Sequence, residues 1–301
     1  MKVLVSGGAG FIGSHMVDRL VEEKHQVSVV DFLGETSIRY QNPETTFYEA
    51  DIRNEKDLER IFDEEMPEIV IHMAAQSVVP PSIKNPSFDQ SINVGGTLQI
   101  LEQMRRVGSR KIIYSSTAAV YGDPISLPIS EDHPIEPKSP YGLSKWIAEH
   151  YIALYHRMYG IDYSILRYAN IYGPRQTADG EGGVVSIFVD KLKKNEAPTI
   201  NGDGGHTRDF VFVKDVVEAN LLAMDKGSKQ VMNISTGQAI SIAELLQTLN
   251  EVNGTNIQPI FAAEREGDIV HSTLNPTKAF EALGWKATTS LNEGLGKTLA
   301  K

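Results

Sequence analysis

A tyrosine and a lysine four residues apart, Tyr141 and Lys145, form a pair suited to proton chemistry. Ser139 and Pro140 precede the pair, and a serine N-cap followed by proline predicts that a helix begins there. Residues four apart lie one turn apart on the same helix face. An ammonium beside a phenol lowers the phenol's pKa from its usual ~10 toward the working range. We therefore expect Tyr141 to act as a general base that removes a proton from an alcohol.

Taken alone, this pair also fits an ordinary amphipathic helix with a solvated lysine. A glycine-rich segment near the start of the chain favours the chemical interpretation. Gly7, Gly10 and Gly13 directly follow a short apolar run and open a helical pattern. The first glycine allows a tight turn, the second lets the backbone approach a pyrophosphate, and the third lets the helix pack close to the strand. The order of strand, glycines and helix predicts a dinucleotide-binding loop.

The nature of the dinucleotide follows from an acid downstream of this loop. Asp31 lies 18 residues past Gly13, at the end of the second predicted strand. A carboxylate there accepts hydrogen bonds from both ribose hydroxyls of an adenosine and repels a 2′-phosphate. The two residues after it provide no cation, so we expect NAD rather than NADP. Asp51 and Ile52, just past the third predicted strand, are weaker candidates for contacts beside the adenine.

Three hydroxyl residues, Ser115, Ser116 and Thr117, end the predicted strand Lys111–Tyr114. Ligands bind at the carboxyl edge of such sheets. A hydroxyl at this edge would hydrogen-bond a substrate oxygen and share its proton with Tyr141.

Short apolar runs and amphipathic stretches alternate over the first 170 residues. The predicted strands are Lys2–Ser6, Gln26–Val30, Thr46–Glu49, Glu68–His72, Lys111–Tyr114 and Tyr163–Leu166. The predicted helices between them are Phe11–Glu23, Glu55–Glu64, Asp89–Val107 and Tyr141–Tyr159. This alternation is typical of right-handed βαβ units, and Val/Ile-rich strands are typical of a parallel sheet covered on both faces. We predict an α/β protein with a Rossmann-type doubly wound parallel sheet.

The alternation loosens after about residue 170. We therefore expect an NAD-binding domain over 1–170 and a smaller, mixed α/β substrate domain over 171–301, with segments from about 207–240 returning to the first. Further helices are expected at Val184–Lys194, Lys214–Met224 and Ile242–Val252. No low-complexity linker marks the boundary.

Composition restricts the partners. The 301 residues include 29 Lys and Arg against 39 Asp and Glu, a net charge of −10, which repels nucleic acid and anionic membrane surfaces. The lack of cysteine excludes disulfides, thiolate catalysis and cysteine-type zinc sites. Apolar runs are shorter than the ~20 residues that span a bilayer, and the start has no signal-peptide core. The eight histidines form no i, i+4 pair with an intervening acid, so we expect no metal and a cytoplasmic enzyme.

Together, these motifs resemble the extended short-chain dehydrogenases that act on nucleotide sugars, over nearly the whole chain. The resemblance implies that Thr117, Tyr141 and Lys145 form the catalytic set. It implies cofactor contacts, besides Asp31, by Phe11, Ile12, Ala74, Ala75, Asn93, Ser115 and Tyr168. It implies contacts to a UDP-hexose by Thr117, Asn170, Val184, Arg208, Arg265, Asp268 and Ser272. In the family pattern the arginines meet the diphosphate and the acid meets the uridine ribose, as their bonding capacities allow. As isolated features, such arginines more often form surface ion pairs.

The residues after Thr117 distinguish among subfamilies. Dehydratases and several decarboxylases of the family carry an acid there, whereas this chain has Ala118 and Ala119, which cannot move a proton. The resemblance therefore implies reversible 4-epimerisation of UDP-glucose and UDP-galactose through transient oxidation at C4 by tightly bound NAD. The small side chain of Ser272 favours acceptance of the N-acetylated sugars as well, unless another group shapes the pocket.

Several alternatives stay open. The first is another nucleotide-sugar epimerase, acting on UDP-glucuronate or UDP-N-acetylglucosamine. A different class is a non-catalytic NAD-sensing regulator, which predicts a broken tyrosine–lysine pair. The family also implies a homodimer through Asp89–Val107 and Tyr141–Tyr159, although a monomer could bury the apolar stripes of these helices internally.

Overall fold

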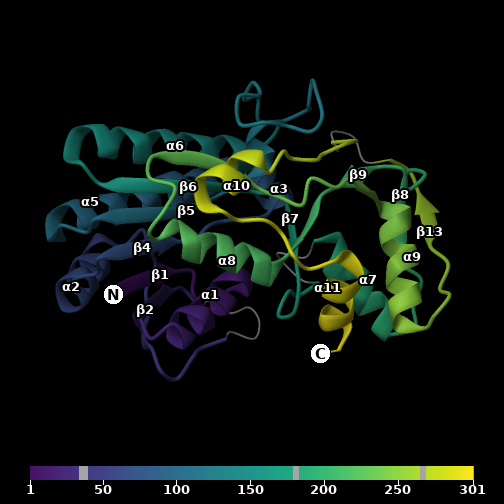
Figure 1. Cartoon of the computed structure of the whole chain (residues 1–301), viewed down its shortest axis with the longest axis horizontal. Helices are drawn as coiled ribbons and strands as arrows, with labels where there is room; N and C mark the ends of the chain where they lie inside the picture. The colour runs from purple at the N-terminus through teal and green to yellow at the C-terminus, as the bar shows by residue number, and fades with distance from the viewer. Residues whose placement is uncertain (34–39, 179–182, 265–268, 301) are drawn as a thin grey trace.

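The computed structural model describes residues 1–33, 40–178, 183–264 and 269–300 (Figure 1). A seven-stranded parallel sheet in the order β11-β6-β5-β4-β1-β2-β3 forms its centre. The strands are β1 (Lys2–Ser6), β2 (Gln26–Asp31), β3 (Thr46–Glu49), β4 (Ile69–His72), β5 (Lys111–Thr117), β6 (Asp162–Tyr168) and β11 (Gln230–Ile234). The strand order reverses between β1 and β4, which is where doubly wound sheets open a ligand crevice. The predicted Rossmann-type doubly wound sheet is confirmed.

All six predicted strands form, but β5 is longer than predicted. It runs to Thr117, because Ser115 pairs in register with Leu166 and Thr117 with Tyr168 of β6. The three hydroxyl residues end the strand, as expected, although the predicted range stopped at Tyr114. The short 3-10 segment η2 (Ala118–Val120) begins only after them.

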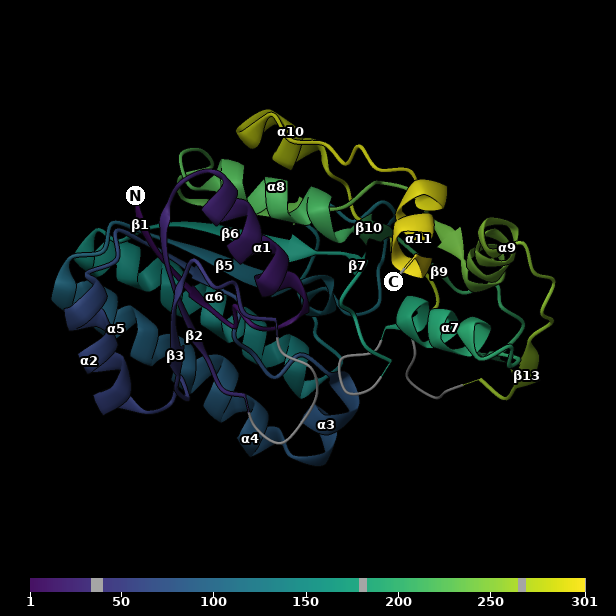
Figure 2. The same ribbon diagram turned by 90° about the horizontal axis from the view of Figure 1, so that it is seen from below.

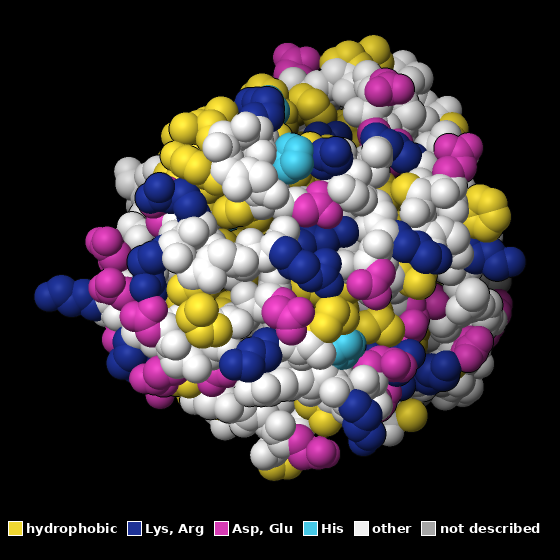
Figure 3. Space-filling view, turned by 60° about the vertical axis from the view of Figure 1, so that its left-hand side comes forward, with side chains coloured by type: hydrophobic (Ala, Val, Ile, Leu, Met, Phe, Trp, Pro, Cys, Tyr) yellow, Lys and Arg dark blue, Asp and Glu magenta, His cyan; other side chains and the backbone are white. Residues whose placement is uncertain are grey.

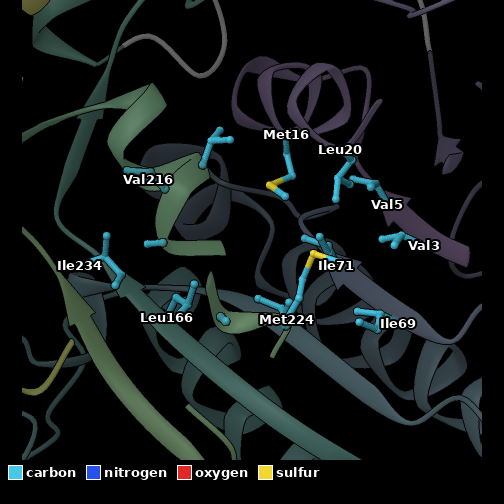
Figure 4. Packing of buried hydrophobic residues seen from close by; sticks show 14 of the residues in the cluster. Val3, Val5, Met16, Leu20, Ile69, Ile71, Leu166, Val216, Met224 and Ile234 are labelled. Carbon is cyan, nitrogen blue, oxygen red and sulfur yellow. The ribbon is translucent and has the colours of Figure 1, made fainter. Parts of the chain in front are cut away.

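Helices cover both faces of the sheet (Figure 2). One layer consists of α1 (Phe11–Glu22), α8 (Val213–Ala223) and α10 (Thr277–Leu283), and the other of α2 (Glu55–Glu65), α5 (Thr97–Val107) and α6 (Pro140–Tyr159). Figure 4 shows the first layer, where Met16 and Leu20 of α1 pack with Val216 and Met224 over β1 and β4. Burying large apolar side chains stabilises a fold by roughly 1.5–3 kcal/mol each. These two layers therefore hold the sheet, and the loops at its carboxyl edge, in place.

The predicted helix Asp89–Val107 is not one regular α-helix. The chain forms α3 (Val79–Lys84), α4 (Pro86–Gln90), a π-helical segment η1 (Ser91–Gly96) and then α5. The Thr97 hydroxyl donates to the backbone oxygen of Asn93 at 2.6 Å, and so bonds within the widened turn. The sequence pattern could not show this, because a π-turn shifts the helical register by one residue without altering composition.

The described part of the chain after β6 builds three small sheets, with helices around them, at the right-hand end of the molecule in Figure 1. The strands are β7 (Asn170–Tyr172) with β10 (Phe210–Phe212), β9 (Thr207–Arg208) with β12 (Ile240–Ser241), and β8 (Thr199–Asn201) with β13 (Ile260–Ala262). The helices around them are α7 (Val184–Lys193), α9 (Ile242–Asn253) and α11 (Leu291–Leu299). Three later segments return to the large sheet, since β11 pairs with β6, α8 packs against α1, and α10 packs in the same helical layer.

The face shown in Figure 3 does not concentrate positive charge. On the face in Figure 3, Lys and Arg are interspersed with Asp and Glu and with apolar side chains. Among the described residues, no helix combines the length and apolar character that a bilayer crossing requires.

Candidate active site

The glycine loop joins β1 to α1 in a conformation that needs its glycines. Gly7 has a φ of 75°, and a Cβ on it would lie 2.6 Å from the backbone nitrogen of Ala74. A Cβ on Gly13 would lie 2.0 Å from the backbone oxygen of Gly7. Gly10 precedes the first residue of α1 without a side-chain cap. The positive end of the helix dipole therefore faces the loop and suits an anion.

Asp31 is fixed at the end of β2, beside this loop. Its Oδ2 accepts the backbone N–H of Ala9 at 2.8 Å, and its Oδ1 accepts that of Phe32 at 2.8 Å. Asp51 forms an ion pair with Arg53, with 2.5 Å between Oδ2 and Nη2. Hydrogen bonds from Arg53 lower the pKa of Asp51. Both carboxylates are therefore placed as acceptors along one edge of the sheet.

A cavity of about 370 Å³ brings almost all the predicted cofactor residues together. Its wall includes Gly7, Gly10, Phe11, Ile12, Gly13, Asp31, Asp51, Ile52, Ala74, Ala75, Ser115, Tyr141, Lys145 and Tyr168. It also includes Phe32, Arg53, Phe88 and Ser116, which the sequence analysis did not single out for contact with a cofactor. The cavity thus runs from the glycine loop to the tyrosine–lysine pair.

Asn93 is the one predicted cofactor residue that does not line this cavity. Its side chain is buried and directed elsewhere. Its Oδ1 accepts the backbone N–H of Gln76 at 2.9 Å, and its Nδ2 donates to the backbone oxygen of Gln76 at 3.0 Å and to Ser144 Oγ at 3.0 Å. Contact between Asn93 and a cofactor therefore stays a prediction. Asn93 ties the loop after β4 to α6.

The tyrosine and lysine lie on the first turns of α6. Ser139 caps this helix, since its Oγ accepts the backbone N–H of Gly142 at 3.1 Å. Lys145 is buried, its Nζ donates to the backbone oxygen of Ser115 at 2.8 Å, and it lies 4.7 Å from the centre of the Tyr114 ring. Burial lowers the pKa of Lys145 to about 8. Tyr141 is half-buried and lines the same cavity, so one wall holds both a phenol and an ammonium.

Thr117 ends β5 and is half-buried. Its Oγ1 accepts the backbone N–H of Ala119 at 3.1 Å, which starts the segment η2. It does not belong to the described cavity wall, whereas Ser115 and Ser116 do. The hydroxyl therefore stands next to the cavity, and its hydrogen can still be donated because this bond uses only a lone pair.

A buried ion pair behind the site was not anticipated from the sequence. Arg167 binds Glu149 through two nitrogens, at 3.0 Å to Oε1 and 2.6 Å to Oε2. Ser116 Oγ donates to the same carboxylate at 2.5 Å. Arg and Glu side chains are usually solvated. In the sequence, the one sign that Arg167 is buried is its position directly after the predicted strand Tyr163–Leu166. The pair fixes α6 to β5 and β6.

His72 lies under Lys145 as a neutral imidazole. The Thr97 hydroxyl uses its hydrogen on Asn93, so it accepts from Nε2 of His72 at 2.9 Å, and Nδ1 accepts from Ser6 Oγ at 2.6 Å. Burial, and then the charge of Lys145, lower the pKa of His72 to about 3. At neutral pH, His72 therefore adds no charge near the ammonium.

Four predicted substrate residues are not part of this cavity wall and belong to the smaller part of the chain: Asn170, Val184, Arg208 and Ser272. Asn170 is exposed and pairs in register with Phe210, close in sequence to Arg208. Arg208 Nη1 donates to the backbone oxygens of Thr207 at 2.8 Å and Val270 at 3.3 Å. The backbone N–H of Ser272 donates to Thr207 at 3.1 Å. The structure thus brings Asn170, Arg208 and Ser272 into one neighbourhood.

The remaining predicted substrate residues are less informative. Val184 is the half-buried first residue of α7. Arg265 and Asp268 lie outside the described residues.

Comparison with known proteins agrees with this geometry. Residues 3–235 match the model of the "NAD dependent epimerase/dehydratase family". A protein of Methanocaldococcus jannaschii named "Putative UDP-glucose 4-epimerase" is 48% identical over 99% of this chain and 97% of its own length.

Solved structures are similar over the whole chain. The UDP-glucose 4-epimerase of Thermotoga maritima with UDP-glucose has a TM-score of 0.97 and 44% identity, covering 100% of this chain and 98% of that one. The UDP-glucose 4-epimerase of Thermus thermophilus with NAD has a TM-score of 0.93 and 38% identity, with the same coverages. The UDP-N-acetylglucosamine 4-epimerase of Methanobrevibacter ruminantium has a TM-score of 0.94 and 32% identity, covering 99% of this chain and 97% of that one.

Proposed function

The chain belongs to the NAD dependent epimerase/dehydratase family, and from this membership we propose that it interconverts UDP-glucose and UDP-galactose with tightly bound NAD. One observation carries the proposal. A single cavity holds the glycine loop and Asp31 at one end and Tyr141 with Lys145 at the other. The residues suited to binding a dinucleotide and those suited to taking a proton from an alcohol thus line the same cavity.

The cavity residues fit NAD. The backbone at Gly7 and Gly13 leaves no room for a Cβ, which allows close approach at the uncapped start of α1. That helix end would hold the pyrophosphate, and Asp31 would hold the adenosine ribose. Tyr141 and Lys145 would contact the nicotinamide half. Bound NAD supplies the group that takes a hydride from C4 of the sugar and returns it to either face of the 4-keto sugar.

The chain's own residues move the proton. Tyr141 removes the proton of the C4 hydroxyl and later returns it, while the Lys145 ammonium stabilises the phenolate. Thr117 donates a hydrogen bond to the same substrate oxygen. Ala118 and Ala119 offer no acid for elimination of water, so oxidation and reduction at C4 are the steps that the site supports.

The diphosphate and uridine would lie on the smaller part of the chain. Arg208 and Arg265 would bind the diphosphate, because a guanidinium donates two parallel hydrogen bonds to phosphate oxygens. Asp268 would accept from the uridine ribose, while Asn170 and Val184 would contact the substrate nearby. The backbone N–H of Ser272 and the side chain of Arg208 both donate to the backbone oxygen of Thr207, so the two residues are neighbours. The small side chain of Ser272 favours room for a 2-acetamido group on the sugar. The nearest alternatives are a UDP-glucuronate or UDP-N-acetylglucosamine 4-epimerase.

We further propose a homodimer formed through the helical layer of α5 and α6. Ile83, Phe88 and Leu143, on α3, α4 and α6, are large apolar side chains that a single chain leaves exposed. Light scattering should give twice the mass of one chain, and a single-chain mass at micromolar concentration would contradict the dimer. A cytoplasmic location stays a prediction from composition.

The test of the function uses pure protein without added nucleotide. Incubation with UDP-galactose should yield UDP-glucose with no net NADH, because the cofactor stays bound. A panel with UDP-glucuronate and the two N-acetylated UDP-hexoses then ranks substrates by kcat/KM. Lack of conversion of every UDP-hexose would exclude the proposal and favour the NAD-sensing regulator.

A further inference from the structure

Asp89, the fourth residue of α4, is a completely buried carboxylate near the active site. Its Oδ2 accepts Ser144 Oγ at 2.5 Å, and its Oδ1 accepts Gln76 Nε2 at 2.8 Å and Asn93 Nδ2 at 3.2 Å. All three partners donate, as an ionised carboxylate requires. Within the described part of the chain, no Lys or Arg lies within ion-pair distance of it. A buried charge without a direct counter-ion is costly, so a compensating charge must lie nearby.

Lys145 carries that compensating charge. Ser144, which donates to Asp89, precedes Lys145 directly in α6. Asp89 is the leading charge that favours the ammonium form of Lys145, and Glu149 is the second. Since Arg167 neutralises Glu149 through two hydrogen bonds, Asp89 is the buried negative charge left to balance Lys145.

The other groups that face Lys145 do not replace Asp89. From α6 itself there is Tyr141, whose phenolate is the form that the Lys145 ammonium stabilises in the proposed reaction, so its charge comes and goes with the proton. From β4 there is His72, which is uncharged at neutral pH. From β5 there is Tyr114, whose buried phenol has a raised pKa, and from β6 there is Tyr168, whose pKa is raised to about 12. Neither His72, Tyr114 nor Tyr168 is therefore an anion at neutral pH.

We propose that Asp89, held by the side chain of Ser144 next to Lys145 in α6, is the positioning residue that keeps Lys145 protonated during catalysis through its charge. The proposal rests on the epimerase function, since it assigns Lys145 the role of an ammonium in that reaction. Asp89 does not touch the cavity. It acts on the reaction only through Lys145.

The test measures the protonation of Lys145 directly. The protein, purified with its bound cofactor, is labelled with ε-13C lysine, and the Lys145 signal is assigned as the one missing from Lys145→Arg. Asp89→Asn keeps the shape of the side chain, because its oxygen can accept from Gln76 and Asn93 while its nitrogen donates to Ser144. We expect the titration midpoint of Lys145 to fall by about one pH unit, the size of effect that a nearby opposite charge exerts. The alkaline fall in kcat should shift in the same direction.

Ser144→Ala is the matched control. It removes the 2.5 Å hydrogen bond to the carboxylate but keeps its charge. If the charge of Asp89 is what keeps Lys145 protonated, the titration midpoint of Lys145 in Ser144→Ala stays within about 0.3 pH units of the wild-type value. If Asp89 merely braces the helices, Asp89→Asn and Ser144→Ala weaken folding without moving the midpoint, which would overturn the proposal.

Two further arms keep the result interpretable. Asp89→Ser removes the charge with a smaller side chain and gives the same readout if Asp89→Asn fails to fold. The NMR midpoint does not depend on turnover of any UDP-sugar. A wild-type protein that does not epimerise would therefore refute the proposed function, while an unchanged midpoint in both Asp89 variants would refute the role of Asp89.

Discussion

The ammonium of Lys145 donates a 2.8 Å hydrogen bond to the backbone oxygen of Ser115. This bond joins helix α6, which carries the proposed base Tyr141, to the last residues of β5, which include Ser115 and Thr117. The ammonium is therefore fixed by a backbone atom rather than by a mobile side chain. Its position relative to Tyr141 then follows from the helix, in which the two residues are one turn apart.

Tyr141→Phe should abolish proton transfer while the fold and the cofactor cavity stay intact. General acid–base groups contribute typically 10²–10⁴-fold, so kcat should fall by about that factor. The measurement is kcat with UDP-galactose, together with bound NAD per chain. Tyr159→Phe is the matched control, since it makes the same chemical change at an exposed residue near the other end of α6. Equal losses in both variants would show that Tyr141 is not the base.

Activity should fall as the pH rises through about 8. Burial lowers the pKa of Lys145 to about 8, so the ammonium is present below this pH and lost above it. The phenolate of Tyr141 then loses the charge that stabilises it. A profile of kcat from pH 6 to 10 measures this, with circular dichroism at each pH to show that the fold persists. Constant kcat up to pH 10 would contradict the role of Lys145.

His72 should make the fold sensitive to acid. Its pKa is about 3 in the folded chain against roughly 6.5 when unfolded, so between these values only the unfolded chain binds the proton. Stability is therefore complete above about pH 6.5 and is lost as the pH falls toward 3. Between pH 7 and pH 5, this one group should remove about 2 kcal/mol from the free energy of unfolding.

Urea unfolding of wild type and His72→Gln at both pH values measures that difference. The variant should lose about 2 kcal/mol less than wild type over this interval. An equal loss in the two proteins would mean that His72 is not a buried neutral imidazole.

The glycine loop should not tolerate a methyl group at Gly13. A Cβ there would lie 2.0 Å from the backbone oxygen of Gly7, so the loop must shift. We expect Gly13→Ala to lose bound NAD and to lower Tm, since overpacking costs typically 1–3 kcal/mol. At Gly95 a Cβ meets nothing within 4 Å, and Gly95→Ala should stay within ~1 kcal/mol of wild type. Retention of NAD by Gly13→Ala would contradict the proposed pyrophosphate site.

Local signals in the sequence were enough to predict the sheet and the cofactor cavity. The tight loop requires glycine at Gly7 and Gly13, and the dinucleotide-binding pattern places an acid such as Asp31 at the end of the second strand. These requirements produce a spacing that can be recognised in the sequence. Tyr141 and Lys145 became significant only together with that loop. The strands of the sheet could be predicted because β1 and β4, for example, are short, nearly continuous apolar runs.

Features that depend on tertiary packing were not predictable. Asp89 was read as the start of a helix, and its contact with Ser144 joins residues 55 positions apart. The pairing of Glu149 with Arg167 likewise depends on how α6 crosses β6. The π-helical segment that contains Asn93 interrupts the predicted helix, and pairing with β6 extends β5 to Thr117.

The central claim, hydride return to C4 within one active site, is tested most directly with UDP-galactose deuterated at C4. The purified protein, without added cofactor, should convert it to UDP-glucose that keeps the deuterium at C4, as read by proton NMR from the missing C4 proton. Product with hydrogen at C4, or no product at all, would contradict the account.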